Sequence, residues 1–90
     1  MKKFEVKYIV CDEAHKMGAK DGYCQGKSDM VEAESADEAI SIVAERIANT
    51  AEKIYLHDVV DWCFEAKGAF VNVETGDDTL YYDCFTAVKA

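Results

Sequence analysis

Several features that mark membrane or secreted proteins are missing from this sequence. It contains no proline, and no window reaches the roughly 18 apolar residues that a transmembrane helix requires. The basic start Met1–Lys3 is followed by charged residues within 4–8, where a signal peptide would need an apolar run. We therefore expect a cytoplasmic protein that does not enter the membrane.

Basic residues are scarce, with 10 Lys and Arg against 18 Asp and Glu and a formal net charge of −8. The imbalance is uneven, because residues 28–90 carry 14 acids and 4 bases whereas residues 1–27 carry 4 acids and 6 bases. Proteins that bind nucleic acid directly normally neutralise its phosphates with clustered bases. The charge therefore indicates a cationic partner, such as the nucleic-acid-binding surface of another protein, and disfavours direct nucleic-acid binding.

Catalytic and cofactor motifs are also missing. The sequence shows no strand–turn–helix elbow and no close Cys/His pairing that would indicate a nucleophile. Gly18, Gly22 and Gly26 recur at four-residue intervals in a polar segment, unlike the clustered glycines of a phosphate-binding loop. A chain of 90 residues has room for one core but not for a large internal pocket. We predict a single domain over 1–90, without enzymatic activity or a cofactor.

The 4 cysteines, at positions 11, 24, 63 and 84, include no CxxC pair. An even number would predict disulfides in a small secreted domain, but without a secretion signal we expect reduced thiols. The alternative is a zinc site formed by Cys11, His15 and Cys24, with a fourth ligand such as His57. This set lacks the paired short spacing by which zinc sites are recognised, so we expect no bound metal.

Alternation of apolar and polar residues predicts five strands. In residues 3–10 the apolar face consists of Phe4, Val6, Tyr8 and Val10. Extended patterns also cover 29–34, 59–65, 69–74 and 79–89. Strict alternation in the last of these predicts one face made of Leu80, Tyr82, Cys84, Thr86 and Val88. The intervening segment 11–27 predicts a long connection with a helical turn near 13–17, which is either functional or a wide hairpin loop without a binding role.

Residues 35–38 form a capping box, in which the Ser35 hydroxyl can accept a hydrogen bond from the Glu38 N–H. An apolar stripe at helical spacing follows, and Ile42 falls outside it, beside Glu38 and Glu45. The position of Ile42 indicates either a partner contact or a single exposed apolar side chain. We predict an α+β fold in which about five antiparallel strands, in the order β-β-α-β-β-β, carry one amphipathic helix on one face.

Two stretches, MKKFEVKYIV at 1–10 and VEAESADEAI at 31–40, combine a first strand with a second strand that leads into the capped helix. Over residues 1–10 and 28–50 the chain resembles small phage and mobile-element proteins of the DpnD/PcfM-like kind and several anti-CRISPR proteins. This resemblance implies a phage-borne or mobile-element accessory protein that acts by stoichiometric binding. In the anti-CRISPR case the target would be a nucleic-acid-handling complex.

We therefore predict a non-enzymatic inhibitor that uses acidic side chains to occupy a basic nucleic-acid-binding site on a host defence complex. The first alternative is a small module that homo-oligomerises, for example as a homodimer, through sheet edges and the apolar residues Ile42, Tyr81 and Phe85. The second is the Cys/His metal-binding protein described above. The predicted partner-binding residues lie on the second strand, the helix and the C-terminal hairpins: Glu32, Glu34, Glu38, Ile42, Glu45, Asp58, Asp61, Glu65, Glu74, Asp77, Asp78 and Asp83.

Overall fold

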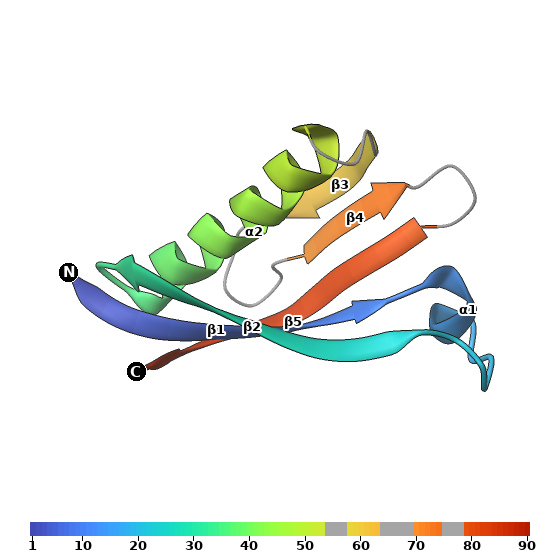
Figure 1. The fold of residues 1–90 in the computed structure, drawn as a ribbon, viewed down its shortest axis with the longest axis horizontal. Helices are drawn as coiled ribbons and strands as arrows, with labels where there is room; N and C mark the ends of the chain where they lie inside the picture. The colour runs from blue at the N-terminus through green and yellow to red at the C-terminus, as the bar shows by residue number, and fades with distance from the viewer. Residues whose placement is uncertain (54–57, 64–69, 75–78) are drawn as a thin grey trace.

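The computed structural model describes the backbone of residues 1–53, 58–63, 70–74 and 79–90, and the side chains of 1–50, 70–74 and 79–90. The predicted β-β-α-β-β-β order is present, with a short helix added in the first connection (Figure 1). The elements are β1 (Lys2–Cys11), α1 (Glu13–Lys16), β2 (Cys24–Ala33), α2 (Ala36–Lys53), β3 (Asp58–Cys63), β4 (Phe70–Glu74) and β5 (Thr79–Lys89). The predicted turns at 66–68 and 75–78 lie outside the described residues.

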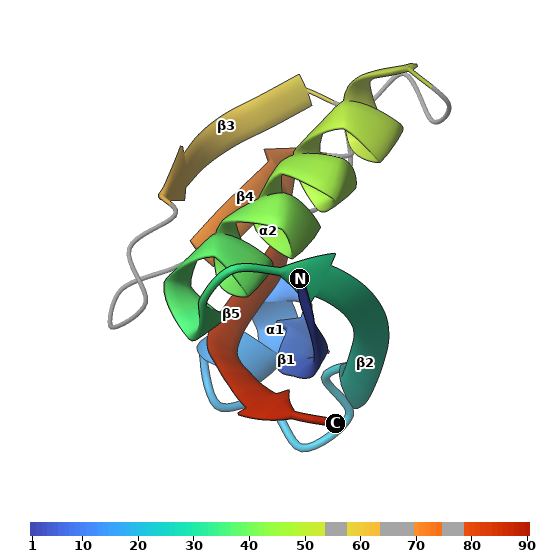
Figure 2. The ribbon, with the colours of Figure 1, turned by 90° about the vertical axis from the view of Figure 1, so that its left-hand side faces the viewer.

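All five strands belong to one antiparallel sheet in the order β2-β1-β5-β4-β3. The last strand of the chain pairs with the first, so β5 lies between β1 and β4. Figure 2 shows the strong twist of this sheet and α2 lying across one of its faces. The predicted α+β fold, with five antiparallel strands and one long helix, is confirmed.

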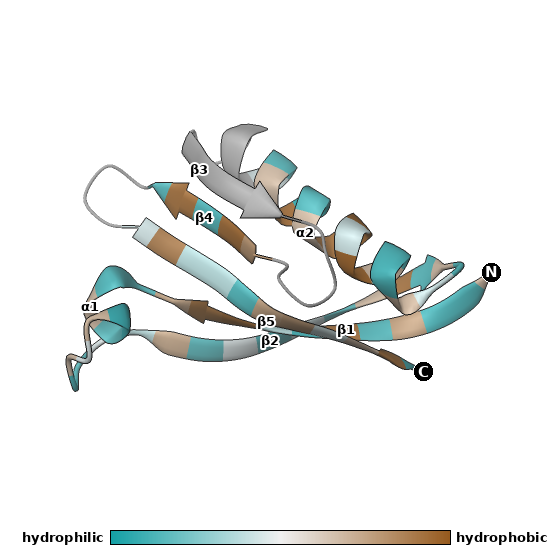
Figure 3. Ribbon diagram, turned by 180° about the vertical axis from the view of Figure 1, so that it is seen from behind, coloured by the Kyte–Doolittle hydropathy of each residue, from teal (hydrophilic) through white to brown (hydrophobic). Residues whose placement is uncertain are grey.

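The core lies between α2 and the sheet. The predicted apolar face of β1 is buried, and on α2 the buried side chains include Ile40, Val43 and Ala44. Complete burial of a valine such as Val43 or Val71 contributes about 1.5–3 kcal/mol each. Figure 3 shows polar residues on the outward turns of α2 and apolar residues where the helix meets the sheet. This burial orients the polar side of α2 towards solvent.

Ile42 differs from its predicted position. It is half-buried and packs against the hydrophobic core instead of projecting from the polar side of the helix. The physical reason is the shape of the sheet, because α2 contacts all five of its strands. A strongly twisted sheet covers a wider sector of a helix than one narrow apolar stripe would indicate.

A β-bulge interrupts the pairing of β5 with β1. The register shifts between Lys7 and Ile9, so that Tyr8 lies opposite two residues, Cys84 and Phe85. Cys84 adopts a positive φ of 58°, a left-handed conformation that costs an ordinary residue about 1–2 kcal/mol. The bulge therefore changes which residues of β5 face the core.

The predicted strict alternation of β5 is therefore wrong beyond Asp83, where the bulge reverses which residues face the core. Phe85 is buried and stacks on Tyr8 with 5.2 Å between ring centroids, and it lies in the same core as Leu80, whereas Cys84 is exposed. Phe85 is therefore not available as the surface contact that the oligomerisation hypothesis assigned to it. Tyr81, another residue in that hypothesis, is half-buried.

The second strand begins earlier than its pattern predicts, at Cys24 instead of Asp29. Its first residues, 24–28, are all exposed, so they show no apolar alternation. The predicted helical turn is α1, and residues 12–23 form a wide loop that closes the β1–β2 hairpin. None of the helices described is long and apolar enough to cross a membrane.

Candidate functional site

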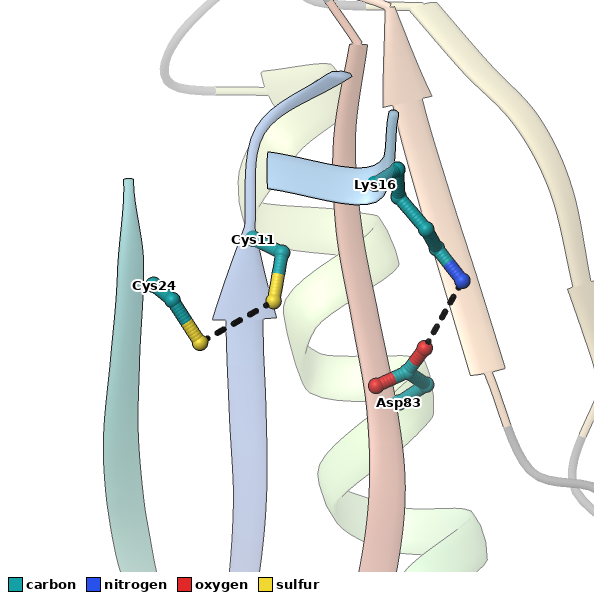
Figure 4. Close-up of polar contacts among 4 residues, drawn as sticks. All are labelled: Cys11, Lys16, Cys24 and Asp83. Carbon is teal, nitrogen blue, oxygen red and sulfur yellow. Dashed lines mark hydrogen bonds and ion pairs between the residues drawn. The ribbon is translucent and has the colours of Figure 1, made fainter. Parts of the chain in front are cut away.

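The two ends of β2 carry the candidate functional groups. At its beginning, Cys24 pairs with Cys11, the last residue of β1, and their Sγ atoms lie 3.3 Å apart (Figure 4). Val10 belongs to the hydrophobic core, so the alternation of β1 places Cys11 on the opposite face of the sheet. Cys11 is 7% exposed, Cys24 is exposed, and both are free thiols.

His15 joins these two cysteines from helix α1. The metal-ligating atoms of Cys11, His15 and Cys24 all lie within 4.8 Å of one another. We call these three residues the Cys–His corner. Two sulfur atoms and an imidazole form a donor set that suits zinc and related thiophilic metals. The fold therefore brings together the alternative zinc ligands, whereas the proposed fourth ligand His57 lies outside the described residues.

The backbone of His15 is held in place by contacts within the loop. Its N–H donates a 2.8 Å hydrogen bond to Oδ1 of Asp12, the N-cap of α1, and the Asp12 N–H donates to the Tyr23 carbonyl at 3.1 Å. A Cβ atom on Gly22 would lie only 2.3 Å from the His15 backbone nitrogen. Any residue other than glycine at this position would therefore displace the His15 backbone. The returning arm of the loop therefore packs directly on His15.

Helix α1 is also fixed to the sheet. The Lys16 ammonium lies 3.3 Å from a carboxylate oxygen of Asp83 and 5.2 Å from the centroid of the Tyr81 ring, both on β5. Figure 4 shows α1 and this ion pair on the side of the strands away from α2. Asp83, predicted as a partner-binding residue, is thus half-buried and paired within the chain.

The thiols of Cys11 and Cys84 are held in their protonated form, because their pKa values are raised. Burial, with a smaller contribution from the hydrogen bond to Cys24, raises the pKa of Cys11 to about 11. A hydrogen bond with Asp83, followed by burial, also raises the pKa of Cys84. Cysteine nucleophiles need a thiolate, which these environments disfavour in the absence of a metal.

At the other end of β2, exposed carboxylates gather where the strand leads into α2. We define the acidic corner as Glu32, Glu34, Asp37 and Glu38, four acids within seven residues. None of them forms an ion pair with another described residue. The predicted cap is confirmed, because the Ser35 Oγ accepts a 3.2 Å hydrogen bond from the Glu38 N–H.

The predicted acidic set does not form one flat surface. Glu32 lies opposite Lys3 on the sheet face away from α2, whereas Glu38 and Glu45 lie on the exposed side of α2, seven residues apart. The acids therefore wrap around the sheet edge. Arg46 is the exposed base beside Glu45 on the helix.

The remaining predicted residues belong to the C-terminal strands. Glu74 is exposed at the end of β4, opposite Asp58 of β3, and Asp61 lies opposite Asn72. The side chains of Asp58 and Asp61 are not among those described. Three further residues lie outside the described ranges: Glu65, Asp77 and Asp78.

Sequence reasoning missed the residues that position His15. Lys16 and Gly22 act through an ion pair and a close backbone approach that depend on the folded hairpin, whereas Asp12 acts through a local cap three residues before His15. The sequence did name Cys11, His15 and Cys24 as alternative zinc ligands, but it gave no sign that Cys24 begins a strand paired with β1, because residues 24–28 show no apolar alternation.

Comparison with known proteins gives no match for this chain among family models, curated proteins or solved structures. The resemblance to DpnD/PcfM-like and anti-CRISPR proteins therefore stays a prediction. The candidate functional groups are the exposed carboxylates at one end of β2 and the clustered thiols and imidazole at the other.

Proposed function

We propose that this chain is a non-enzymatic binding protein that inhibits a host nucleic-acid-handling defence complex by placing its acidic corner in a basic site. The observation that supports this proposal is that Glu32, Glu34, Asp37 and Glu38 are exposed and form no ion pair with the rest of the described chain. Their charge is available to an external cation.

Electrostatics gives these residues a role in association. Four neighbouring carboxylates produce a negative potential that attracts a basic surface and speeds the encounter. The surrounding salt limits this attraction to a range of about 8–10 Å at physiological ionic strength. Association with a basic partner also relieves the repulsion among the four carboxylates, because Lys and Arg side chains then lie between them.

The acidic corner is attached to the rigid part of the fold. Val31 and Ala33 are buried on either side of Glu32, Glu34 follows Ala33 directly, and the capped first turn of α2 carries Asp37 and Glu38. Its carboxylates are therefore presented by anchored backbone. The class of target comes from the charge and from the resemblance, since a groove that binds phosphates also accepts carboxylates.

The test is affinity capture from a bacterial lysate, followed by identification of the retained proteins and measurement of their affinity. The variant Glu32→Gln/Glu34→Gln/Glu38→Gln removes three charges and keeps a glutamine that can complete the capping box. The matched control, Glu5→Gln/Glu13→Gln/Asp21→Asn, removes three charges from residues 1–27.

We expect capture of a complex with a basic nucleic-acid-binding groove, released by added salt and by competing DNA or RNA. Affinity should fall at least tenfold in the acidic-corner variant and much less in the control. Equal losses in the two variants, or retention that competing nucleic acid leaves unchanged, would contradict the proposal.

A further inference from the structure

The Cys–His corner has the composition and the proximity of a metal site. Cys11 and Cys24 come from paired positions of two strands and His15 from the helical turn between them, with all three ligand atoms within 4.8 Å. We propose that these three residues bind a thiophilic divalent metal ion, best matched by zinc. This inference is independent of the acidic corner and of the proposed function.

The separation of the two sulfur atoms fits tetrahedral coordination after a small movement. Zinc bonds of about 2.3 Å to sulfur in a tetrahedron imply about 3.8 Å between two sulfur ligands. The Cys11 and Cys24 sulfurs are 3.3 Å apart, which is close to this value and well beyond the bonding distance of about 2.05 Å in a disulfide. The exposed His15 side chain can rotate to complete the arrangement.

The loop supports this geometry through contacts that do not involve the metal-ligating atoms. Asp12 caps the helical turn, Gly22 allows the loop to close on the His15 backbone, and Lys16 ties the turn to β5. Metal ligands that are positioned before binding lose little conformational freedom when the ion arrives. The wide hairpin loop thus has a structural reason for its length, because it carries the imidazole back over Cys11.

The coordination would be incomplete with these three residues alone. No fourth cysteine, histidine or carboxylate joins the group among the residues that the structure describes. Cys24 and His15 are exposed, so the remaining position faces solvent and can take a water molecule. Each thiol loses its proton on binding, and the ion links β1, β2 and α1.

Cobalt(II) titration of the reduced full-length protein tests the site, because cobalt reports its ligands by absorption. We expect one equivalent to produce thiolate-to-cobalt charge-transfer bands and the intense visible bands of a tetrahedral site, and zinc to abolish both. Cys24→Ser should remove most of the charge-transfer intensity, and His15→Ala should weaken binding at least tenfold. Cys84→Ser is the matched control, since it removes another exposed thiol and should leave the titration unchanged.

Gly22→Ala provides a second variant that keeps all three ligands and displaces only the backbone of His15. Its cobalt affinity should fall while its circular dichroism stays close to that of the original protein. The proposal is overturned if cobalt gives only the weak spectrum of an octahedral ion. It is also overturned if His15→Ala binds as tightly as the original protein, or if Cys84→Ser loses as much intensity as Cys24→Ser.

Discussion

The two ends of β2 differ in how many contacts their polar groups make with the rest of the chain. At the Cys24 end, the cap of α1, the Lys16–Asp83 ion pair and the close approach of Gly22 fix α1 to the rest of the chain. At the Ala33 end, about 30 Å away along a strand of 10 residues, four exposed carboxylates lack ion pairs within the described chain. One end is organised around an internal cluster and the other is left open to a partner.

This difference follows from the chemistry of the groups. Exposed carboxylates are well solvated and can remain unpaired at little cost in free energy. Two thiols and an imidazole whose ligating atoms lie within 4.8 Å of one another form instead a donor set suited to a shared metal ion. The same edge strand can therefore present one site for a metal ion and another for a basic surface.

The largest expected difference between the two ends of β2 concerns stabilisation by zinc. At about 100 times its dissociation constant, it is expected to stabilise the fold by about 2.7 kcal/mol, which raises the Tm by roughly 10–20 °C in a domain of this size. Cys24→Ser should abolish the rise, whereas Glu34→Gln at the other end should preserve it. Thermal unfolding with and without zinc measures both, and an equal rise in the two variants would remove the distinction.

Alanine substitutions at two glycines near the Cys24 end should change the free energy of unfolding in opposite directions. Gly22→Ala forces a Cβ to within 2.3 Å of the His15 backbone and should lower the free energy of unfolding by about 1–3 kcal/mol. Gly26→Ala meets no atom within 4 Å and should raise it by about 0.5 kcal/mol. Urea denaturation measures both values, and similar effects would show that the loop does not pack tightly on His15.

The two helix caps should differ in what they stabilise. Ser35→Ala removes the cap of α2 and should cost about 1 kcal/mol of global stability, because α2 carries core residues. Asp12→Ala should change global stability less, since α1 buries no residue, but it should weaken cobalt binding by releasing His15. Ser35→Asp is the control that restores a cap, and chemical denaturation beside a cobalt titration measures the pair. A large loss of global stability from Asp12→Ala would contradict this division.

The smallest effect is the pH dependence of the caps. Hydrogen bonds from backbone N–H groups, chiefly that of His15, lower the pKa of Asp12 below its ordinary value. The cap is therefore fully present above the ordinary aspartate pKa of about 3.9 and is lost as the pH falls through the lowered value. Hydrogen exchange should show the His15 N–H losing protection in acid while the Glu38 N–H, capped by the Ser35 hydroxyl, keeps it. If both N–H groups lost protection at the same pH before global unfolding, the two caps would not differ in their pH dependence.

Much of the fold could be predicted from local patterns. Alternation in residues 3–10 identified β1 and its buried face, and the capping box placed the start of α2 within one residue. The start of β2 was not predicted, because its first five residues are exposed and therefore show no apolar alternation. The bulge at Cys84 also escaped, since an extra residue reverses the alternation without a glycine to mark it.

The candidate sites divide in the same way. The acidic corner is contiguous in sequence, so its charge, its strand-to-helix position and its helix cap were all readable from residues 32–38. The Cys–His corner joins positions 11, 15 and 24, and its irregular spacing argued against a metal site. The proximity arises from the register of a hairpin, which sequence spacing does not report.

The sequence by itself determined the strand and helix pattern, the segregation of charge and the chemistry of the available ligands, because each of these depends on residues near one another in the chain. Only the tertiary structure decided that β5 pairs with β1, that Phe85 is buried, and that Cys11, His15 and Cys24 meet. These outcomes depend on strand register, on one bulge and on a loop closing over a sheet. Such long-range pairings are selected by the burial of the whole core rather than by any local segment.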